Sequence, residues 1–185
     1  FVIAEGAAVL ILEAWDVAEA RGATILAEVL GGASTADAHH ITAPSPGGSG
    51  AVSCMELALD DAGLTAAEVA HVNAHGTSTQ LNDAAEADAV AKVFGLPGPP
   101  ITSVKGVLGH ALGAAGALEA VAAVLTLQKG LIPPTVGFTT RDPELPAIDI
   151  VHDAPREWTP GPIVSNSFGF GGHNGTLIIG PGNPR

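Results

Sequence analysis

The sequence has few cysteines and few cations, and both shortages exclude classes of function. A single cysteine among 185 residues cannot form a disulfide within the chain, and it fits a reducing cytoplasm. Seven lysines and arginines against 19 acidic residues give a net charge of −12. With no basic run in the chain, we expect no nucleic-acid-binding surface. A chain of this length is most simply one domain with one substantial core.

Long hydrophobic runs are also scarce. The longest apolar stretch is interrupted by Glu119, and no signal peptide is recognisable. We therefore expect no membrane partner and a cytoplasmic location. The chain begins at Phe1, without methionine and directly in a strand-like run, which indicates a fragment whose natural start is missing.

Strand-like and helix-like segments alternate along the chain, and this pattern predicts the α/β class. The predicted strands are residues 1–3, 8–12, 24–31, 69–73, 101–104, 148–151, 163–166 and 175–179. The predicted helices are residues 14–21, 51–62, 83–94 and 111–128. Between them, residues 34–50 form a long loop, which is typically functional or mobile.

Residues 101–119 contain the strongest candidate for an active site. A β-branched run ends at Lys105, a glycine-rich turn follows, and His110 stands at the predicted start of an apolar helix. The positive end of that helix would oppose protonation, so His110 is expected to be neutral and to donate from one ring nitrogen. The charge of Lys105 would lower the pKa of a nearby imidazole. Glu119 in the apolar helix needs a partner, and Lys105 is the candidate.

Two further stretches place polar turns after strand-like runs. One, Val-Asn-Ala-His-Gly-Thr-Ser-Thr at 72–79, carries His75, which from spacing alone could be a histidine satisfied in a turn. The other, Asn-Ser-Phe-Gly-Phe-Gly-Gly-His-Asn, occupies 166–174. Together with Lys-Gly-Val-Leu-Gly-His-Ala-Leu-Gly-Ala-Ala-Gly at 105–116, these motifs resemble the β-ketoacyl-acyl-carrier-protein synthases. Those proteins are elongating condensing enzymes with the thiolase fold, and the likeness is closest to the synthase II type.

The resemblance implies a layered α/β/α, thiolase-like fold of which this chain is the C-terminal half. Residues 1–23 would be the tail of the N-terminal half, and residues 24–185 the C-terminal domain. In this family two histidines, matched by His75 and His110, bind the malonyl thioester carbonyl and stabilise the enolate as carbon dioxide leaves. Two N–H donors on one oxygen form an oxyanion hole. The matched Lys105 holds the histidines together electrostatically, and the matched Glu119 gives structural support.

The resemblance also assigns contacts to the substrate. The matched positions are Thr77, Thr79, Phe168, Phe170, Asp37 and His40. The threonine hydroxyls would contact the pantetheine arm, and Phe170 would be a gating residue on a glycine-rich, mobile loop. Asp37 and His40 would belong to a second mobile loop. From the residues alone, the threonines could be ordinary turn residues and the phenylalanines core aromatics beside a turn.

The sequence predicts no metal and no organic cofactor. His71 and His75 lie in a strand-like run instead of on a helix, and the histidine pair at 39–40 has no cysteine or carboxylate cluster beside it, so neither predicts zinc. The glycine runs match neither the Walker A motif nor the dinucleotide fingerprint. By resemblance, phosphopantetheine would arrive on the carrier-protein substrate.

The nucleophile of a condensing enzyme is not recognisable in these residues. Such an enzyme carries the acyl chain on a cysteine activated at a helix N-terminus. Cys54 instead lies inside the predicted helix 51–62 with no glycine-rich turn before it, so it is expected to be structural. The resemblance assigns the catalytic cysteine to the first half of the fold, and this chain alone is expected to be inactive.

The predicted function is decarboxylative Claisen condensation of malonyl-acyl-carrier-protein with an acyl thioester, in fatty-acid or polyketide chain elongation. The expected partners are the acyl carrier protein, the N-terminal half of the fold and a second copy in a homodimer. Two alternatives stay open. A non-catalytic chain-length factor would lack the cysteine. A thiolase-type acyltransferase acting on coenzyme A thioesters would be expected to carry a second cysteine near the C-terminus, and residues 168–173 have none.

Overall fold

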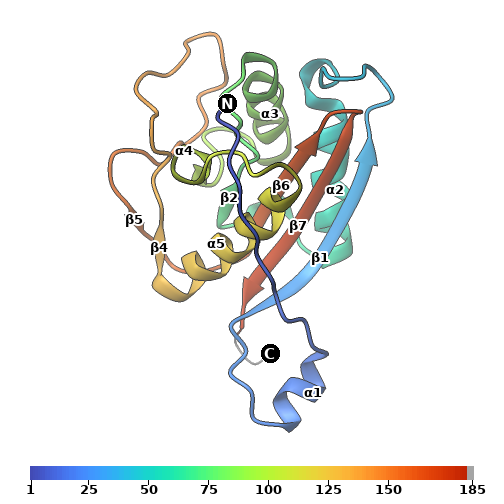
Figure 1. The fold of residues 1–185 in the computed structure, drawn as a ribbon, viewed down its shortest axis with the longest axis vertical. Coiled ribbons are helices and arrows are strands. Elements are labelled where there is room, and N and C mark those ends of the chain that lie inside the picture. Colours follow the sequence, from blue (N-terminus) through green and yellow to red (C-terminus); the bar gives the residue numbers. More distant parts are fainter. Residues whose placement is uncertain (183–185) are drawn as a thin grey trace.

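The computed structural model describes residues 1–182 and is built on a mixed five-stranded sheet with the strand order β1-β7-β6-β2-β3 (Figure 1). The strands are β1 (Ala27–Ala36), β2 (His71–Asn73), β3 (Ile101–Thr102), β6 (Ile163–Gly169) and β7 (His173–Pro181). β7 runs antiparallel to both β1 and β6, while β2 runs parallel to both β6 and β3. A second, two-stranded sheet pairs β4 (Leu131–Ile132) with β5 (Arg156–Glu157).

Helices cover both faces of the main sheet (Figure 1). On one face lie α2 (Ser49–Ala62) and α3 (Gln80–Phe94), and on the other lies α5 (Ala115–Lys129). The shorter elements are α1 (Trp15–Ala20), α4 (Lys105–Leu108) and 3₁₀ turns at Pro46–Gly48, Ala66–Glu68 and Leu112–Ala114. This layering confirms the predicted α/β/α arrangement. The predicted division at residues 23 and 24 stays a prediction.

The alternation of side chains along the central strands creates two separate cores. Val164 of β6 and Ile178 of β7 point toward α2 and α3. Their chain neighbours Ile163 and Ile179 point toward α5. Because both faces are covered, these strands read in the sequence as continuous apolar runs instead of alternating patterns.

The two strands predicted near the N-terminus are wrong. Residues 1–3 contribute one bridge, between Ile3 and His110, and residues 8–12 form no ladder. Val9 and Ile11 are 82% and 86% exposed, although the apolar run predicted a strand covered on both faces. A strand needs a neighbour to satisfy its backbone groups, and residues 1–182 provide none beside this segment. The predicted strand at 148–151 likewise reduces to one bridge, between Ile150 and Ile101.

The C-terminal hairpin was predicted correctly, but its strands are longer and its loop is shorter than expected. β6 and β7 leave only residues 170–172 between them, and Gly171 and Gly172 both have positive φ angles that favour glycine. β1 also continues to Ala36, because its last residues pair with the start of β7. The predicted loop at 34–50 therefore begins only after β1.

Helix ends follow their local sequence signals. Gly63 adopts the left-handed conformation that closes α2, a usual role of glycine after a helix. A capping box forms between Thr65 and Glu68, which have the spacing of that motif: the Thr65 N–H donates to the Glu68 carboxylate at 2.8 Å. These features depend on residues close in sequence, which is why the sequence predicts them.

The helix predicted at 111–128 starts later and is less covered than its composition suggests. α5 begins at Ala115, and Leu125 is 49% exposed. The N-terminal segment crosses the outer side of the helix, where Gly6 packs against Leu118 (Figure 1). By length and composition alone, Leu112–Lys129 could cross a membrane, a test that core helices of soluble proteins also pass. Because α5 packs on the sheet and holds an ion pair at Glu119, we describe it as a core helix.

Candidate active site

The candidate site lies where the parallel strands β2 and β3 end. His75 follows β2 by two residues, and Lys105 starts α4 shortly after β3. His110 follows α4, and its ring lies beside that of His75. The carboxyl ends of parallel strands are the usual position of binding crevices in α/β sheets. The two distant sequence motifs therefore meet because their strands are neighbours in the sheet.

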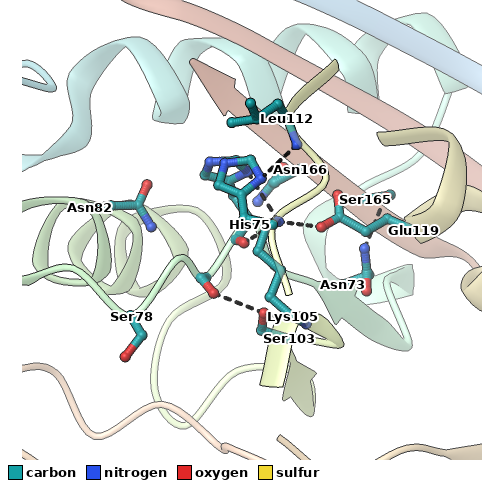
Figure 2. A network of polar contacts seen from close by, with 12 residues as sticks. Asn73, His75, Ser78, Asn82, Ser103, Lys105, Leu112, Glu119, Ser165 and Asn166 are labelled. Atoms are coloured by element: carbon teal, nitrogen blue, oxygen red, sulfur yellow. Dashed lines mark hydrogen bonds and ion pairs between the residues drawn. The ribbon is translucent and has the colours of Figure 1, made fainter. Parts of the chain in front are cut away.

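Lys105 is the centre of the polar network (Figure 2). Its side chain is only 6% exposed and forms an ion pair with Glu119, as predicted. The same ammonium group donates to the backbone carbonyl of His75 and lies 3.3 Å from His75 Nδ1. A buried charge with three partners is fixed in place, so Lys105 ties α5 to the turn after β2.

His75 is a neutral histidine in this environment. Burial lowers its pKa to about 3, and the charges of Lys105 and His110 lower the pKa in the same direction. Because the Lys105 ammonium is a donor only, Nδ1 of His75 must accept, and the ring proton resides on Nε2. The Nε2–H is left as the group that His75 can offer to a ligand.

His110 reaches the same protonation state by different contacts. Its backbone is paired with the N-terminal segment, through His110 N to Val2 O at 2.8 Å and Ala4 N to His110 O at 3.0 Å. Its Nδ1 accepts the N–H of Leu112 at 3.2 Å, so its proton also resides on Nε2. Leu112 has a φ of 51°, a strained value for a leucine, and such strain is typical of functional sites.

The predicted place of His110 at a helix start is wrong, because α5 begins five residues later, at Ala115. The predicted neutrality of the imidazole nevertheless agrees with its pKa. Burial lowers the pKa of His110, and the charge of Lys105 adds to the effect. Desolvation and a nearby cation therefore do what the helix dipole was expected to do.

The two imidazoles stand close together and nearly at right angles. Their ring centroids are 5.3 Å apart with an angle of 82° between the planes. Each ring uses Nδ1 for a contact within the protein and keeps an Nε2–H donor. Two such donors near one another can hold a single oxygen on which negative charge develops.

Glu119 is a buried carboxylate, and within residues 1–182 its second oxygen has no hydrogen-bond partner of normal geometry. Burial raises its pKa to about 7, and the opposing influence of Lys105 is the smaller of the two. Desolvation therefore outweighs the ion pair. Glu119 supports Lys105, and it has no contact of its own with either imidazole ring.

Glu86 belongs to the site, although none of the sequence motifs contains it. α3 begins at Gln80, so Glu86 lies in its second turn and is buried. Its carboxylate accepts the backbone N–H groups of His75 at 2.9 Å and Gly76 at 2.8 Å. The available signal was its helical spacing from Ala89 and Val90, which places it on the buried face.

The residues predicted to contact the substrate differ in their burial and in their contacts. Thr77 is buried, and its hydroxyl is 2.9 Å from that of Thr79. The Phe168 ring lies against His75, with centroids 5.7 Å apart. Phe170 is 69% exposed, at the tip of the hairpin loop.

Asp37 joins the second predicted loop to the hairpin loop. Its carboxylate accepts Asn174 Nδ2 at 2.7 Å and the Ser45 N–H at 2.8 Å. Its backbone N–H also donates to Gly172 O. His40 is exposed, and its Nδ1 contacts two backbone N–H groups and the Thr42 hydroxyl of its own loop. The structure therefore brings Asp37, but not His40, into contact with the Phe170 loop.

Two other sequence candidates lie apart from the site. Cys54 is fully buried in the interior of α2, with Sγ 3.4 Å from Ala33 O, which agrees with a structural role. His71 is buried against Trp158, with ring centroids 5.7 Å apart. Within residues 1–182, no three histidine, cysteine or carboxylate side chains gather in a way that could hold a metal ion.

Comparisons by sequence point to one family. The model of the β-ketoacyl synthase C-terminal domain matches residues 26–139. The chain is 43% identical over 181 residues to the 3-oxoacyl-[acyl-carrier-protein] synthase 2 of Staphylococcus aureus, covering 97% of this chain and 45% of that protein. It is also 43% identical over 182 residues to the chloroplastic synthase II of Arabidopsis thaliana, covering 98% and 34%. The chain thus spans less than half the length of these relatives.

Comparisons by structure agree. A β-ketoacyl synthase from Burkholderia phymatum STM815 superposes with a TM-score of 0.88 at 41% identity, covering 91% of this chain and 41% of that one. The ishigamide ketosynthase/chain length factor gives 0.85 at 41% identity, covering 90% and 40%. A ketosynthase in complex with its type II polyketide acyl carrier protein gives 0.88 at 34% identity, covering 91% and 42%. Because one family model covers more than half of the chain and solved ketosynthases share its fold, the chain belongs to the β-ketoacyl synthase family, as the C-terminal half of its thiolase fold.

Proposed function

We propose that the intact protein extends acyl chains by decarboxylative condensation of malonyl-acyl-carrier-protein, in fatty-acid elongation or a related polyketide pathway. The observation that carries this proposal is the pair of neutral imidazoles, His75 and His110, each with Nδ1 occupied and Nε2–H free. The names of the Staphylococcus aureus and Arabidopsis thaliana relatives support the same substrate class.

The decarboxylation step uses both imidazoles. The carbonyl oxygen of the malonyl thioester would accept the Nε2–H groups of His75 and His110. The bond between the α-carbon and the carboxylate then breaks, carbon dioxide leaves, and its electron pair passes into the enolate, whose oxygen bears the new charge. Stabilising that charge with fixed donors in a site shielded from water lowers the barrier. The α-carbon then attacks the acyl thioester and displaces its thiolate.

The buried network keeps the donors ready. The Lys105 ammonium holds Nδ1 of His75 as an acceptor, and the Leu112 N–H does the same for His110. Each contact blocks the alternative tautomer, in which Nδ1 carries the proton and Nε2 can only accept. The acyl chain would be held by a nucleophile outside this chain, because Cys54 is buried in α2.

The surrounding residues suit a long, flexible thioester. The hydroxyls of Thr77 and Thr79 would bind the pantetheine arm that a carrier protein delivers. Phe170, on its glycine-rich loop, would admit the malonyl group by moving, and the Asp37 loop would move with it because the two are hydrogen-bonded. His40 would contact the carrier from the outside. The acyl carrier protein, the N-terminal half of the fold and a second copy are the proposed partners.

The test is carbon dioxide release from malonyl-acyl-carrier-protein by the intact protein. His75→Ala and His110→Ala should each lower the rate by about 10²- to 10³-fold, as expected for loss of one oxyanion donor. His152→Ala is the matched control, because His152 contacts Phe138 and Asp153 away from this site. Full activity in both site variants would rule out the proposed role.

A chain-length factor is the second candidate, supported by the likeness to the ishigamide ketosynthase/chain length factor structure. Such a subunit binds chains without condensing them, so the intact protein would release no carbon dioxide on its own and would do so only with a separate ketosynthase. The complete His75, Lys105 and His110 set favours the catalytic alternative. The compartment is left to experiment, since the Arabidopsis thaliana relative is chloroplastic.

A further inference from the structure

Asn166 is a polar residue on an apolar face. It lies in the middle of β6 and is fully buried. Its strand neighbours Val164 and Phe168, which share its face, pack into the core formed with α2 and α3. An amide costs free energy in such a place unless its groups are hydrogen-bonded, whereas a leucine would pack there at no such cost. Packing alone therefore does not explain why an asparagine occupies this position.

Its contacts lead to the candidate site. Asn166 Oδ1 accepts the hydroxyl of Thr176 at 2.9 Å, from the residue directly opposite on β7. Asn166 Nδ2 is 3.4 Å from Glu86 Oε1 and 3.4 Å from the sulfur of Met55. Figure 2 draws Asn166 among the residues of the polar network that includes His75. The hydroxyl on β7 thus fixes an amide on β6, and the amide donates to the carboxylate on α3.

Glu86 depends on such donors. It is buried, and within residues 1–182 its hydrogen-bond donors are the N–H groups of His75, Gly76 and Asn166. Burial raises its pKa, and each of these donors opposes that rise. Two of the three are the backbone groups that place the His75 ring. The third donor, Asn166, lies on β6, outside the turn at His75 and Gly76 that the Glu86 carboxylate binds.

We propose that Asn166 is a positioning residue for the condensation reaction, which keeps the Glu86 carboxylate aimed at the His75 and Gly76 backbone and so fixes the His75 ring. Thr176 acts one step behind it by fixing the Asn166 amide. The inference rests on the proposed function, because it assigns the two residues a purpose in decarboxylation. Neither residue touches the substrate.

The charged groups facing Glu86 do not replace Asn166. Lys105 from α4 lowers the pKa of Glu86 through its charge, and Glu119 from α5 interacts with Glu86 as a like charge. Both groups are already engaged with one another. From α2, Met55 contacts the same Asn166 amide, and its sulfur has no proton to donate.

The first experiment substitutes the amide. Asn166→Leu should lower the rate constant of malonyl decarboxylation by the intact protein about 10- to 100-fold, with little change in KM, because a displacement of the order of 1 Å has such effects. Asn166→Asp, assayed at pH 6, should be more active than Asn166→Leu, because a protonated aspartic acid can donate to Glu86 where leucine cannot. Equal activity of the wild type and Asn166→Leu would overturn the proposal.

A double-mutant cycle separates positioning from general core damage. In a Glu86→Ala background, which removes the acceptor of the Asn166 amide, Asn166→Leu should cause less than a twofold further loss, since its route to His75 through residue 86 is gone. Losses that multiply would assign Asn166 to core packing and contradict the proposal. Should Asn166→Leu not fold, Thr176→Val, which keeps the side-chain shape, decides the question in the same two backgrounds with a smaller loss expected.

A measurement that does not depend on catalysis tests the positioning role of Asn166 independently of the proposed function. Hydrogen exchange of the His75 and Gly76 amides should be about tenfold faster in Asn166→Leu than in the wild type, because their acceptor is less fixed. Unchanged exchange would refute the positioning role. A wild type that releases no carbon dioxide would refute the proposed function, while faster exchange in the variant would still support the link from Asn166 to His75.

Discussion

Replacing Glu119 by glutamine tests which force dominates the buried ion pair. Burial raises the folded-state pKa of Glu119 from 4.5 to about 7 despite the ammonium of Lys105. Between pH 4.5 and 7 the folded protein therefore holds a proton that the unfolded chain releases. Stability from this group is present below pH 4.5 and is lost as the pH rises through 7. At about 1.4 kcal/mol per pKa unit, the loss is about 3 kcal/mol.

The assay is urea unfolding of the wild type and Glu119→Gln at pH 4.5 and pH 8. An amide does not titrate, and the other ionisable groups are shared, so they largely cancel in the difference. We expect the wild type to lose about 3 kcal/mol relative to the variant over this range. A wild type that instead gains stability relative to the variant as pH rises would mean that Lys105 lowers the Glu119 pKa. That result would refute the argument that desolvation wins.

Two further predictions concern His71 and the glycines near α4. His71 is buried, neither of its ring nitrogens has a hydrogen-bond partner within residues 1–182, and burial lowers its pKa to about 3. Below pH 6.5 the unfolded chain binds a proton at His71 that the folded protein does not bind, so acid destabilises the fold. His71→Phe should remove about 3 kcal/mol of this destabilisation between pH 6.5 and 4, as measured by urea unfolding. An unchanged dependence of stability on acid pH would contradict this prediction. At Gly106 an added Cβ would lie 2.0 Å from Val136 O, whereas at Gly113 it would meet nothing within 4 Å. Gly106→Ala should therefore lower both Tm and decarboxylation while the control Gly113→Ala lowers neither, and equal effects would show that α4 is not tightly packed.

Much of the fold could be predicted because its signals are local. The hairpin of β6 and β7, the end of α2 at Gly63 and the capping box at Thr65 all depend on residues within a few positions of each other. The strand predicted at 8–12 was wrong for the opposite reason. Its apolar run describes a strand that needs a neighbour, and a sequence pattern cannot supply the partner.

The residues of the candidate site also differ in how far the sequence could predict them. His75 and Lys105 shortly follow the ends of β2 and β3, where periodicity and composition direct attention to them, and His110 lies in the glycine-rich stretch after Lys105. Glu86 and Asn166 could not be found so easily, because their importance lies in contacts across 80 residues of chain. The neutrality of His110 was expected from a helix dipole, yet the structure attributes it to burial and Lys105. The neutral state of the imidazole was thus easier to predict than the groups that cause it.

The central claim is that two neutral imidazoles present Nε2–H donors to one oxygen, and nitrogen NMR of the ¹⁵N-histidine-labelled intact protein tests it most directly. At pH 7 the account predicts that His75 and His110 both carry a proton on Nε2 and none on Nδ1, with assignments from the His75→Ala and His110→Ala variants. The His75 ring should stay unprotonated at pH 6, in keeping with its pKa of about 3, and His110 should have a pKa below the usual value of a histidine. An imidazolium at pH 7, or a proton on Nδ1 of either ring, would contradict the account.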